Sequence, residues 1–296
     1  MTRIVQEGYA KQQVCAVLDV SRASYYRRCK RQTRTVCAKR QRLRAHVKAL
    51  FEASGRSYGS RRIKVALMAQ NIMVGRYQIS QIMQELDIRP VWKKAFVRTT
   101  DSQHKLPVAE NLLDQQFNPT QPNPCEAVLL RVGDITYICT QSGWLYLAAV
   151  MNLYSRKIVG YAISSRMTAD LVCTALQLAI QMRQPPAGLI VHTDRGSQYC
   201  SGQYQSLLSH HEFRCSMSGK GNCYDNAVME RFFLSLKTER VWQQHYANHQ
   251  EAIRDISRYI VAFYNGVRLH STLGYQSPNQ FEQANQNLLN RLSHFA

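Results

Sequence analysis

The sequence predicts an α/β domain preceded by a small, basic, all-α region, and three observations support this division. Residues 1–100 hold 22 Lys and Arg against 5 Asp and Glu, whereas residues 101–296 hold 16 against 14. Apolar residues recur at helical spacing in the first hundred residues, and β-rich runs begin only after residue 126. Four prolines interrupt the stretch between them. We therefore expect a helical region over 1–98, a linker over 99–125, an α/β core over 126–285 and a tail over 286–296.

Composition excludes several classes of protein. Hydrophobic residues make up 45% of the chain and charged residues 19%, which is typical of a globular protein rather than a disordered one. No run approaches the ~18 apolar residues of a membrane span, and no hydrophobic signal segment is evident, so we expect a cytoplasmic protein without a membrane partner. Nine cysteines occur without a C-x-x-C pair, which favours reduced, mostly buried thiols over disulfides or a zinc site.

The basic region contains two candidate helical units. Residues 12–30 predict two short helices with a turn at 19–21, the second capped by Ser21, as in a helix-turn-helix or an unrelated helical hairpin. The second unit, about 45–98, has three apolar stripes at helical spacing. The basic block is typical of a nucleic-acid-binding module, although a solvated surface or one that binds acidic protein or lipid remains open. Its candidate DNA contacts are Arg61, Arg62 and Arg76.

From residue 127 onward the hydrophobic pattern changes and predicts alternating strands and helices. The expected order is β-β-β-α-β-α-β-α, at 127–140, 144–154, 157–164, 168–181, 188–194, 202–212, 214–218 and about 225–242. This order predicts three antiparallel strands followed by parallel additions, which fits the ribonuclease-H-like fold. A last helix over 251–268 and a polar tail with Pro278 close the chain.

Three acidic residues of this domain stand in apolar surroundings. Asp134 lies within the first strand, Asp194 ends the strand LIVHTD, and Glu230 lies among Val228, Phe232 and Phe233 in the long helix. A carboxylate in such a place is costly unless a partner or a metal ion neutralises it, although each one alone is better explained as a capping or salt-bridged acid. Two strand ends and a packed helix can bring all three to one point. Hard oxygen ligands of this kind select Mg²⁺ or Mn²⁺, and two such ions ~4 Å apart can activate and stabilise the oxygens of a phosphodiester.

The residues around these acids carry a resemblance. Asp194 and Glu230 have 35 residues between them, the spacing of the "D,D(35)E" signature of transposases and retroviral integrases. The chain resembles the integrase-type (retroviral-integrase-type) core of the large bacterial insertion-sequence family whose transposase comes from two overlapping reading frames. The upstream word SGRSYGSRRI matches that family's helical domain. The words that carry the resemblance in the core are GDITYI, GWLYLA, LYSRKIVG, HTDRGSQY, SMSGKGNCYDNAVMERFF, LKTE and YNGVRLHSTLGYQSP.

The resemblance implies a DNA transposase that cuts the ends of its element and joins them to a target, with catalysis and metal binding by Asp134, Asp194 and Glu230. Lys237 lies about two helical turns after Glu230 and so projects from the same face toward DNA. Asn226 shares that face, although helix capping is its alternative.

Further expectations concern the flanking loop and the partners. Lys220, in a Gly-rich loop, could contact DNA or belong to a mobile connection, whereas His192 is better explained as a satisfied structural histidine. The resemblance also implies a homo-oligomer on DNA, and a fused or separate upstream reading-frame product as a further partner.

Two positions depart from the family pattern. Arg131 stands where the family usually has Trp, and Asn152 stands where it usually has Asp. Neither change removes an expected metal ligand, but the first lies in the strand that presents Asp134. A catalytically inactive DNA-binding relic or regulator of the element is therefore the alternative function, and a structure-specific nuclease with the same core is a third, disfavoured by LKTE and YNGVRLH.

Overall fold

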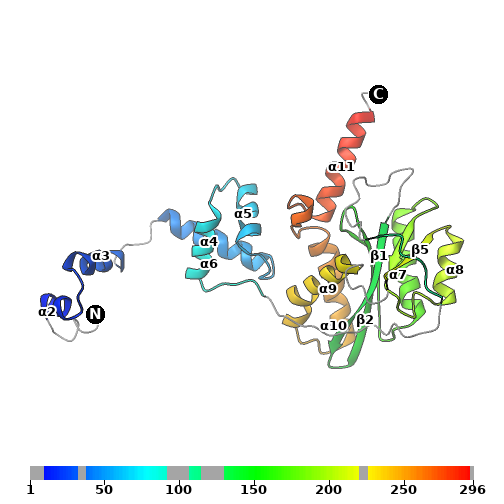
Figure 1. Ribbon diagram of the computed structural model, residues 1–296, viewed down its shortest axis with the longest axis horizontal. Helices are drawn as coiled ribbons and strands as arrows, with labels where there is room; N and C mark the ends of the chain where they lie inside the picture. Colours follow the sequence, from blue (N-terminus) through cyan, green and yellow to red (C-terminus); the bar gives the residue numbers. More distant parts are fainter. Residues whose placement is uncertain (1–9, 33–37, 92–106, 115–129, 220–225, 294–296) are drawn as a thin grey trace.

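The computed structural model describes residues 10–32, 38–91, 107–114, 130–219 and 226–293. Helices come first along the chain, and an α/β core follows (Figure 1). Among the described residues, no helix is both long enough and apolar enough to cross a membrane. The cysteines whose side chains are described are free thiols, of which Cys15, Cys173 and Cys200 are buried.

The first helical unit is a hairpin of α2 (Lys11–Val17) and α3 (Arg22–Gln32). Ser21 Oγ accepts a hydrogen bond from the Ser24 amide at 3.2 Å, which is the expected N-cap of the second helix. The small core of the hairpin consists of Val14, Cys15 and Tyr25. The two expected helices and the turn between them are confirmed.

The second unit, the helical module (residues 38–91), consists of α4 (Ala38–Ala53), α5 (Ser60–Ala69) and α6 (Arg76–Glu85). One apolar stripe of each helix meets the others, as the spacing predicted. Helix α4 begins earlier than expected, because Leu43 extends the stripe of Val47 by one turn. The buried core of the module is Leu43, Val47, Phe51, Tyr58, Ile63, Leu67, Ile79, Ile82 and Met83.

The core contains a five-stranded sheet in the order β3-β2-β1-β4-β5. Its strands are β1 (Leu130–Thr140), β2 (Gly143–Asn152), β3 (Ile158–Ser164), β4 (Ile190–Thr193) and β5 (Arg214–Met217). The first three strands pair antiparallel, and β4 and β5 add in parallel beside β1, which confirms the predicted topology. Strand β1 pairs with β2 without interruption from Arg131 to Thr140, so the strand that carries Asp134 is regular despite the altered segment.

Helices cover both faces of the sheet, and the inner strand β2 is accordingly apolar on both sides. In β2, Ala148 and Val150 face α7 (Ala169–Arg183) and α8 (Gly202–His210). Leu147, Ala149 and Met151 face the opposite layer. That layer contains α9 (Ala227–Glu239), the 3-10 helix η2 (Val241–Gln243), α10 (His249–Arg258) and the π-helix η3 (Tyr259–Tyr264).

The C-terminal segment differs from the prediction. The expected helix over 251–268 is α10 followed by η3, and after the 3-10 helix η4 (Ser271–Leu273) the expected polar tail is α11 (Pro278–Ser293). Ser277 Oγ accepts from the Gln280 amide at 3.3 Å, and the Ser277 amide donates to Gln280 Oε1 at 3.0 Å. This capping box, with Pro278 at the first helical position, starts the helix.

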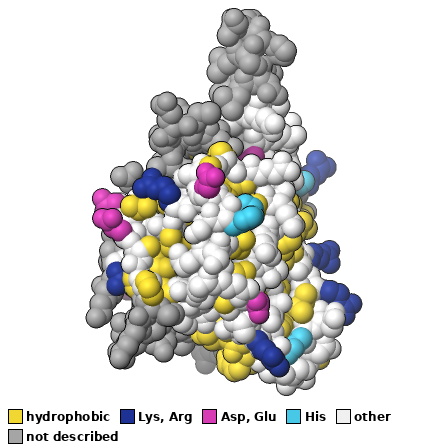
Figure 2. Space-filling view, turned by 90° about the vertical axis from the view of Figure 1, so that its right-hand side faces the viewer, with side chains coloured by type: hydrophobic (Ala, Val, Ile, Leu, Met, Phe, Trp, Pro, Cys, Tyr) yellow, Lys and Arg dark blue, Asp and Glu magenta, His cyan; other side chains and the backbone are white. Residues whose placement is uncertain are grey.

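Part of the expected linker belongs to the core. Leu113 is buried in the layer around α9, and the Leu112 amide donates to Ser216 Oγ at 2.9 Å beside β5. The Met217 amide donates to the Glu110 carbonyl at 3.3 Å. Figure 2 shows the molecule from the side where α8 and β5 lie in Figure 1; side chains of both charges are scattered there among uncharged ones.

Candidate active site

Asp134 and Asp194 lie side by side where β4 ends next to the middle of β1. Strands β1 and β4 run parallel, with Gly133 and Thr193 as register partners, so the two residues that follow them are neighbours. Asp134 Oδ1 accepts from the Ile135 amide at 2.7 Å, and Asp194 Oδ1 accepts from the Gly196 amide at 2.9 Å. Both side chains are partly buried. The fold thus brings together two of the three expected acids.

The electrostatics of this pair are those of crowded negative charge. Burial raises the pKa of Asp134 well above its usual range, and the charges of Asp194 and Glu230 add to the rise. The Ile135 N–H and the Lys237 ammonium act in the opposite direction. A buried acid whose pKa is raised partly by a neighbouring carboxylate marks a place that a cation would stabilise.

Glu230 lies in the first turn of α9, on the exposed side of the helix. Partial burial raises its pKa, and its charge reaches Asp134. Yet within the described part of the chain, no three side chains of His, Cys, Asp or Glu lie close enough to hold one metal ion together. The convergence of all three acids at one point therefore stays a prediction.

Lys237 lies on α9 beside Asp134. Burial lowers its pKa, and the negative charge of Asp134 counteracts the fall. Glu239, two residues further along α9, binds Arg268. Lys237 therefore places its amino group near Asp134.

Two further candidates flank the start of α9. Asn226 is buried immediately before the helix, but its side chain caps no helix amide, and its Oδ1 has no hydrogen-bond partner. The capping explanation for Asn226 is therefore wrong. Lys220 lies outside the described residues.

His192 has the structural role that the sequence favoured. Its Nδ1 lies 2.8 Å from Ser216 Oγ and its Nε2 lies 3.2 Å from Ser218 Oγ. The side chain is fully buried between β4 and β5. Both ring nitrogens are thus occupied by structural hydrogen bonds.

The arginines of the helical module differ from one another. Arg61 and Arg76 are exposed, and Arg76 Nε donates to Ser60 Oγ at 3.5 Å. Arg62, by contrast, lies over the ring of Tyr58 and forms an ion pair with Glu239 of α9 at 3.9 Å. The expectation that Arg62 contacts DNA is not supported, because its guanidinium is already engaged within the protein.

The sequence did not single out Tyr199, which lies beside the aspartates. It is buried, and a Cβ on Gly133 would lie 3.6 Å from its hydroxyl. Burial raises its pKa well above the usual range, and the charges of Asp134 and Asp194 add to the rise. The word HTDRGSQY contains this tyrosine and was the available signal.

Models of known families match most of the chain. Two models described as "Integrase core domain" match residues 127–223 and 211–278, and one described as "HTH-like domain" matches residues 38–96. The chain is therefore an integrase-core protein with an HTH-like domain.

Two relatives narrow the class to a family. The 31 kDa protein of insertion element IS600 from Shigella sonnei is 43% identical over 91% of this chain and 97% of its own length. Transposase InsF for insertion sequence IS3A from Escherichia coli (strain K12) is 42% identical over 95% of this chain and 96% of its own. The chain belongs to the IS3 family of insertion-sequence transposases.

Solved structures with a similar chain trace are more distant in sequence. A chain of the simian T-cell lymphotropic virus intasome is 17% identical, with a TM-score of 0.46, and the match covers 74% of this chain and 69% of that one. The HTLV-2 integrase catalytic core domain in complex with magnesium is 16% identical, with a TM-score of 0.39, over 51% of this chain and 94% of that one.

Proposed function

We propose that this transposase cuts DNA at the ends of its insertion sequence and joins the freed 3′-OH to target DNA, with Asp134, Asp194 and Glu230 as metal ligands. The observation that carries the proposal is the pair of aspartates formed by Asp134 within β1 and Asp194 directly after β4, where burial and the neighbouring negative charge raise the pKa of Asp134. Membership of a transposase family supports the same chemistry.

The residues at this place fit Mg²⁺, with Mn²⁺ as a substitute. The ligands are carboxylate oxygens, which hard divalent cations prefer, and His192 is already used by two serines. Asp134 and Asp194 would hold the metal, and Glu230 would complete the ligand set from α9. Two bound ions, which we also propose, would activate the attacking oxygen and stabilise the leaving oxygen of the phosphodiester.

The remaining residues would bind and orient DNA. Lys237 carries a positive charge beside Asp134 and would contact a phosphate next to the reacting bond. Asn226, directly before α9, would contact the same strand, and we propose the same for Lys220. On the helical module, Arg61 and Arg76 would neutralise backbone phosphates. A homo-oligomer on DNA, with or without the upstream reading-frame product, remains part of the proposal.

The alternative function is a DNA-binding relic or regulator without catalysis. The absence of a ready three-acid cluster among the described side chains favours it. Two observations favour the enzyme. Strand β1 is regular through Asp134, and Asn152 Oδ1 accepts from the Tyr154 amide at 2.9 Å, a role that the oxygen of an aspartate would fill equally well.

The test is a cleavage and joining assay with the full chain, labelled element ends and Mg²⁺ or Mn²⁺. We expect metal-dependent cleavage and joining, and a loss of about 10³-fold or more in Asp194→Asn with DNA binding retained. The matched control is Glu212→Gln, an exposed acid in the turn before β5, which should leave the rate unchanged. A wild-type chain that binds the ends but cuts them in neither metal would establish the relic instead.

A further inference from the structure

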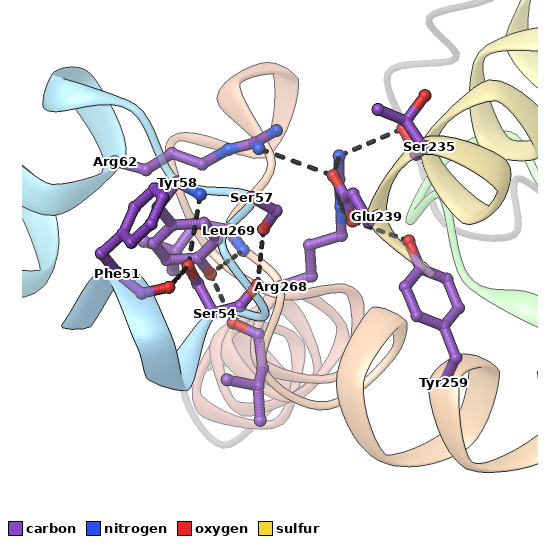
Figure 3. A network of polar contacts seen from close by, with 12 residues as sticks. Phe51, Ser54, Ser57, Tyr58, Arg62, Ser235, Glu239, Tyr259, Arg268 and Leu269 are labelled. Carbon is purple, nitrogen blue, oxygen red and sulfur yellow. Dashed lines mark hydrogen bonds and ion pairs between the residues drawn. The ribbon is translucent and has the colours of Figure 1, made fainter. Parts of the chain in front are cut away.

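The helical module is attached to the catalytic helix through a single acid. Glu239, in the last turn of α9, accepts hydrogen bonds from Arg268 and from Tyr259 Oη at 2.7 Å (Figure 3). Arg62 of α5 pairs with the same carboxylate at 3.9 Å. Arg268 also donates to Ser235 Oγ at 3.1 Å, one turn earlier on α9. One carboxylate thus joins the module, the C-terminal segment and α9.

A second contact holds the module at this place. Tyr58 Oη accepts from the Leu269 amide at 2.9 Å and donates to the Val267 carbonyl at 3.3 Å. The Tyr58 amide in turn donates to Ser54 Oγ at 3.2 Å, which fixes the loop that carries the tyrosine. Leu269 also packs against the core of the module. The loop between α4 and α5 is therefore docked on the segment that binds Glu239.

The geometry of α9 gives this attachment a consequence. At about 100° per residue, Glu239 lies roughly 180° around the helix from Glu230, whereas Lys237 lies within about 20° of it. The network thus holds the side of α9 opposite to the side that faces the aspartates. Because a helix moves as a rigid rod, a group that fixes one side of α9 also fixes the other.

We propose that the helical module positions the catalytic helix through Arg62 and Glu239, so that Arg62 is a positioning residue rather than a DNA contact. This inference rests on the proposed function, because it takes Glu230 and Lys237 as the groups being positioned. DNA held by the module then affects the site mechanically, through α5, Arg62 and α9. A hollow lined in part by Glu52, Arg56, Glu239 and Gln243 lies beside the contact.

The kinetic test compares two adjacent arginines in the full chain. Arg62→Ala should lower kcat for strand transfer by about 10- to 100-fold, the effect of a displacement near 1 Å, and leave KM for DNA unchanged. Arg61→Ala removes a proposed phosphate contact on the exposed side of α5 and should instead raise KM for DNA. Arg62→Lys should restore most of kcat, because a single ion pair at 3.9 Å needs a charge and not a bidentate fork.

A second measurement does not depend on catalysis. Amide hydrogen exchange over residues 227–239 should be faster in Arg62→Ala than in wild type and in Arg61→Ala. An Arg62→Ala variant that raises KM with kcat intact, or one whose α9 exchange matches wild type, would overturn the inference. A wild-type chain without activity would refute the proposed function, and the exchange comparison would still decide whether Arg62 acts on α9.

Discussion

Arg268 forms a bidentate ion pair with the carboxylate of Glu239, in which Nε lies 2.8 Å from Oε2 and Nη2 lies 2.6 Å from Oε1. The side chains are only 6% and 9% exposed. The pair joins the segment after η3 to the end of α9, so the position of the C-terminal segment depends on a buried pair of opposite charges.

Removing one partner of this pair should destabilise the protein strongly. Arg268→Met leaves the buried Glu239 carboxylate with the Tyr259 hydroxyl and the 3.9 Å Arg62 contact but without its bidentate partner. We expect a loss of about 3–5 kcal/mol in the free energy of unfolding. Chemical denaturation measures it. Arg254→Met, at an exposed position of α10, is the control and should cost under about 0.5 kcal/mol. Equal losses in the two variants would show that the Arg268–Glu239 pair contributes no more to the free energy of unfolding than an exposed arginine does.

Gly160 of β3 should not tolerate a side chain. A Cβ there would lie 2.2 Å from the Ala175 carbonyl oxygen and 2.7 Å from the Ala179 amide, both backbone atoms of α7. Gly160→Ala should therefore separate strand and helix and cost about 1–3 kcal/mol or more. Gly202→Ala meets nothing within 4 Å and should be neutral or stabilising. Thermal unfolding of both variants checks this, and equal melting temperatures would contradict the close packing of β3 on α7.

His270 should make stability depend on pH. Burial lowers its pKa from 6.5 to about 3, and the charges of Arg268, Arg62 and Arg156 add to the fall. The unfolded chain therefore binds this proton first as the pH falls. The contribution of His270 is complete above pH 6.5 and declines below it by about 1.4 kcal/mol per pH unit.

Urea unfolding of wild type and His270→Gln at pH 7, 6 and 5 isolates this effect from that of the acids. The free energy of unfolding of wild type should fall relative to the variant by about 1.4 kcal/mol between pH 6 and pH 5. If the difference in unfolding free energy between wild type and variant stays constant across this range, His270 takes up its proton as easily in the folded protein as in the unfolded chain.

The exposed arginines of the helical module should govern the salt dependence of DNA binding. Replacing Arg61 and Arg76 by Ala in the full chain removes two proposed phosphate contacts, so the slope of log K against log salt should become shallower by about 1.8. Arg214→Ala, an exposed arginine on β5, should leave the slope unchanged. A double variant with the wild-type slope would mean that DNA binds elsewhere.

Local patterns predicted much of the fold and two acids of the site. Strand β2 is apolar on both faces, and its run of hydrophobic residues predicted a strand. Asp194 was recognisable because it ends a buried strand, and parallel strand ends meet at one edge of a sheet. Its proximity to Asp134 followed from strand order alone.

Contacts between residues distant in the sequence, and helices of atypical composition, could not be predicted from local patterns. Arg62 looked like its neighbour Arg61, because its partner Glu239 is distant in the sequence and only the docking of the module brings them together. Helix α11 is rich in Asn and Gln, so its sequence was interpreted as a polar tail. The capping box of Ser277 and Gln280 was the sequence signal for a helix. The π-helix η3 continues the periodicity of α10 and cannot be separated from it by spacing.

The central claim is that Glu230 and Lys237 share one face of α9 but act differently, one on the metal and one on DNA. The most direct test is the strand-transfer rate of Glu230→Gln and Lys237→Ala measured across a range of DNA concentrations. Glu230→Gln should bind DNA as well as wild type or better and stay inactive at every concentration, because mass action cannot replace a metal ligand. Lys237→Ala should bind weakly and regain part of its rate at high DNA concentration. A Glu230→Gln variant that reaches the wild-type rate, or a Lys237→Ala variant with unchanged affinity and rate, would contradict the account.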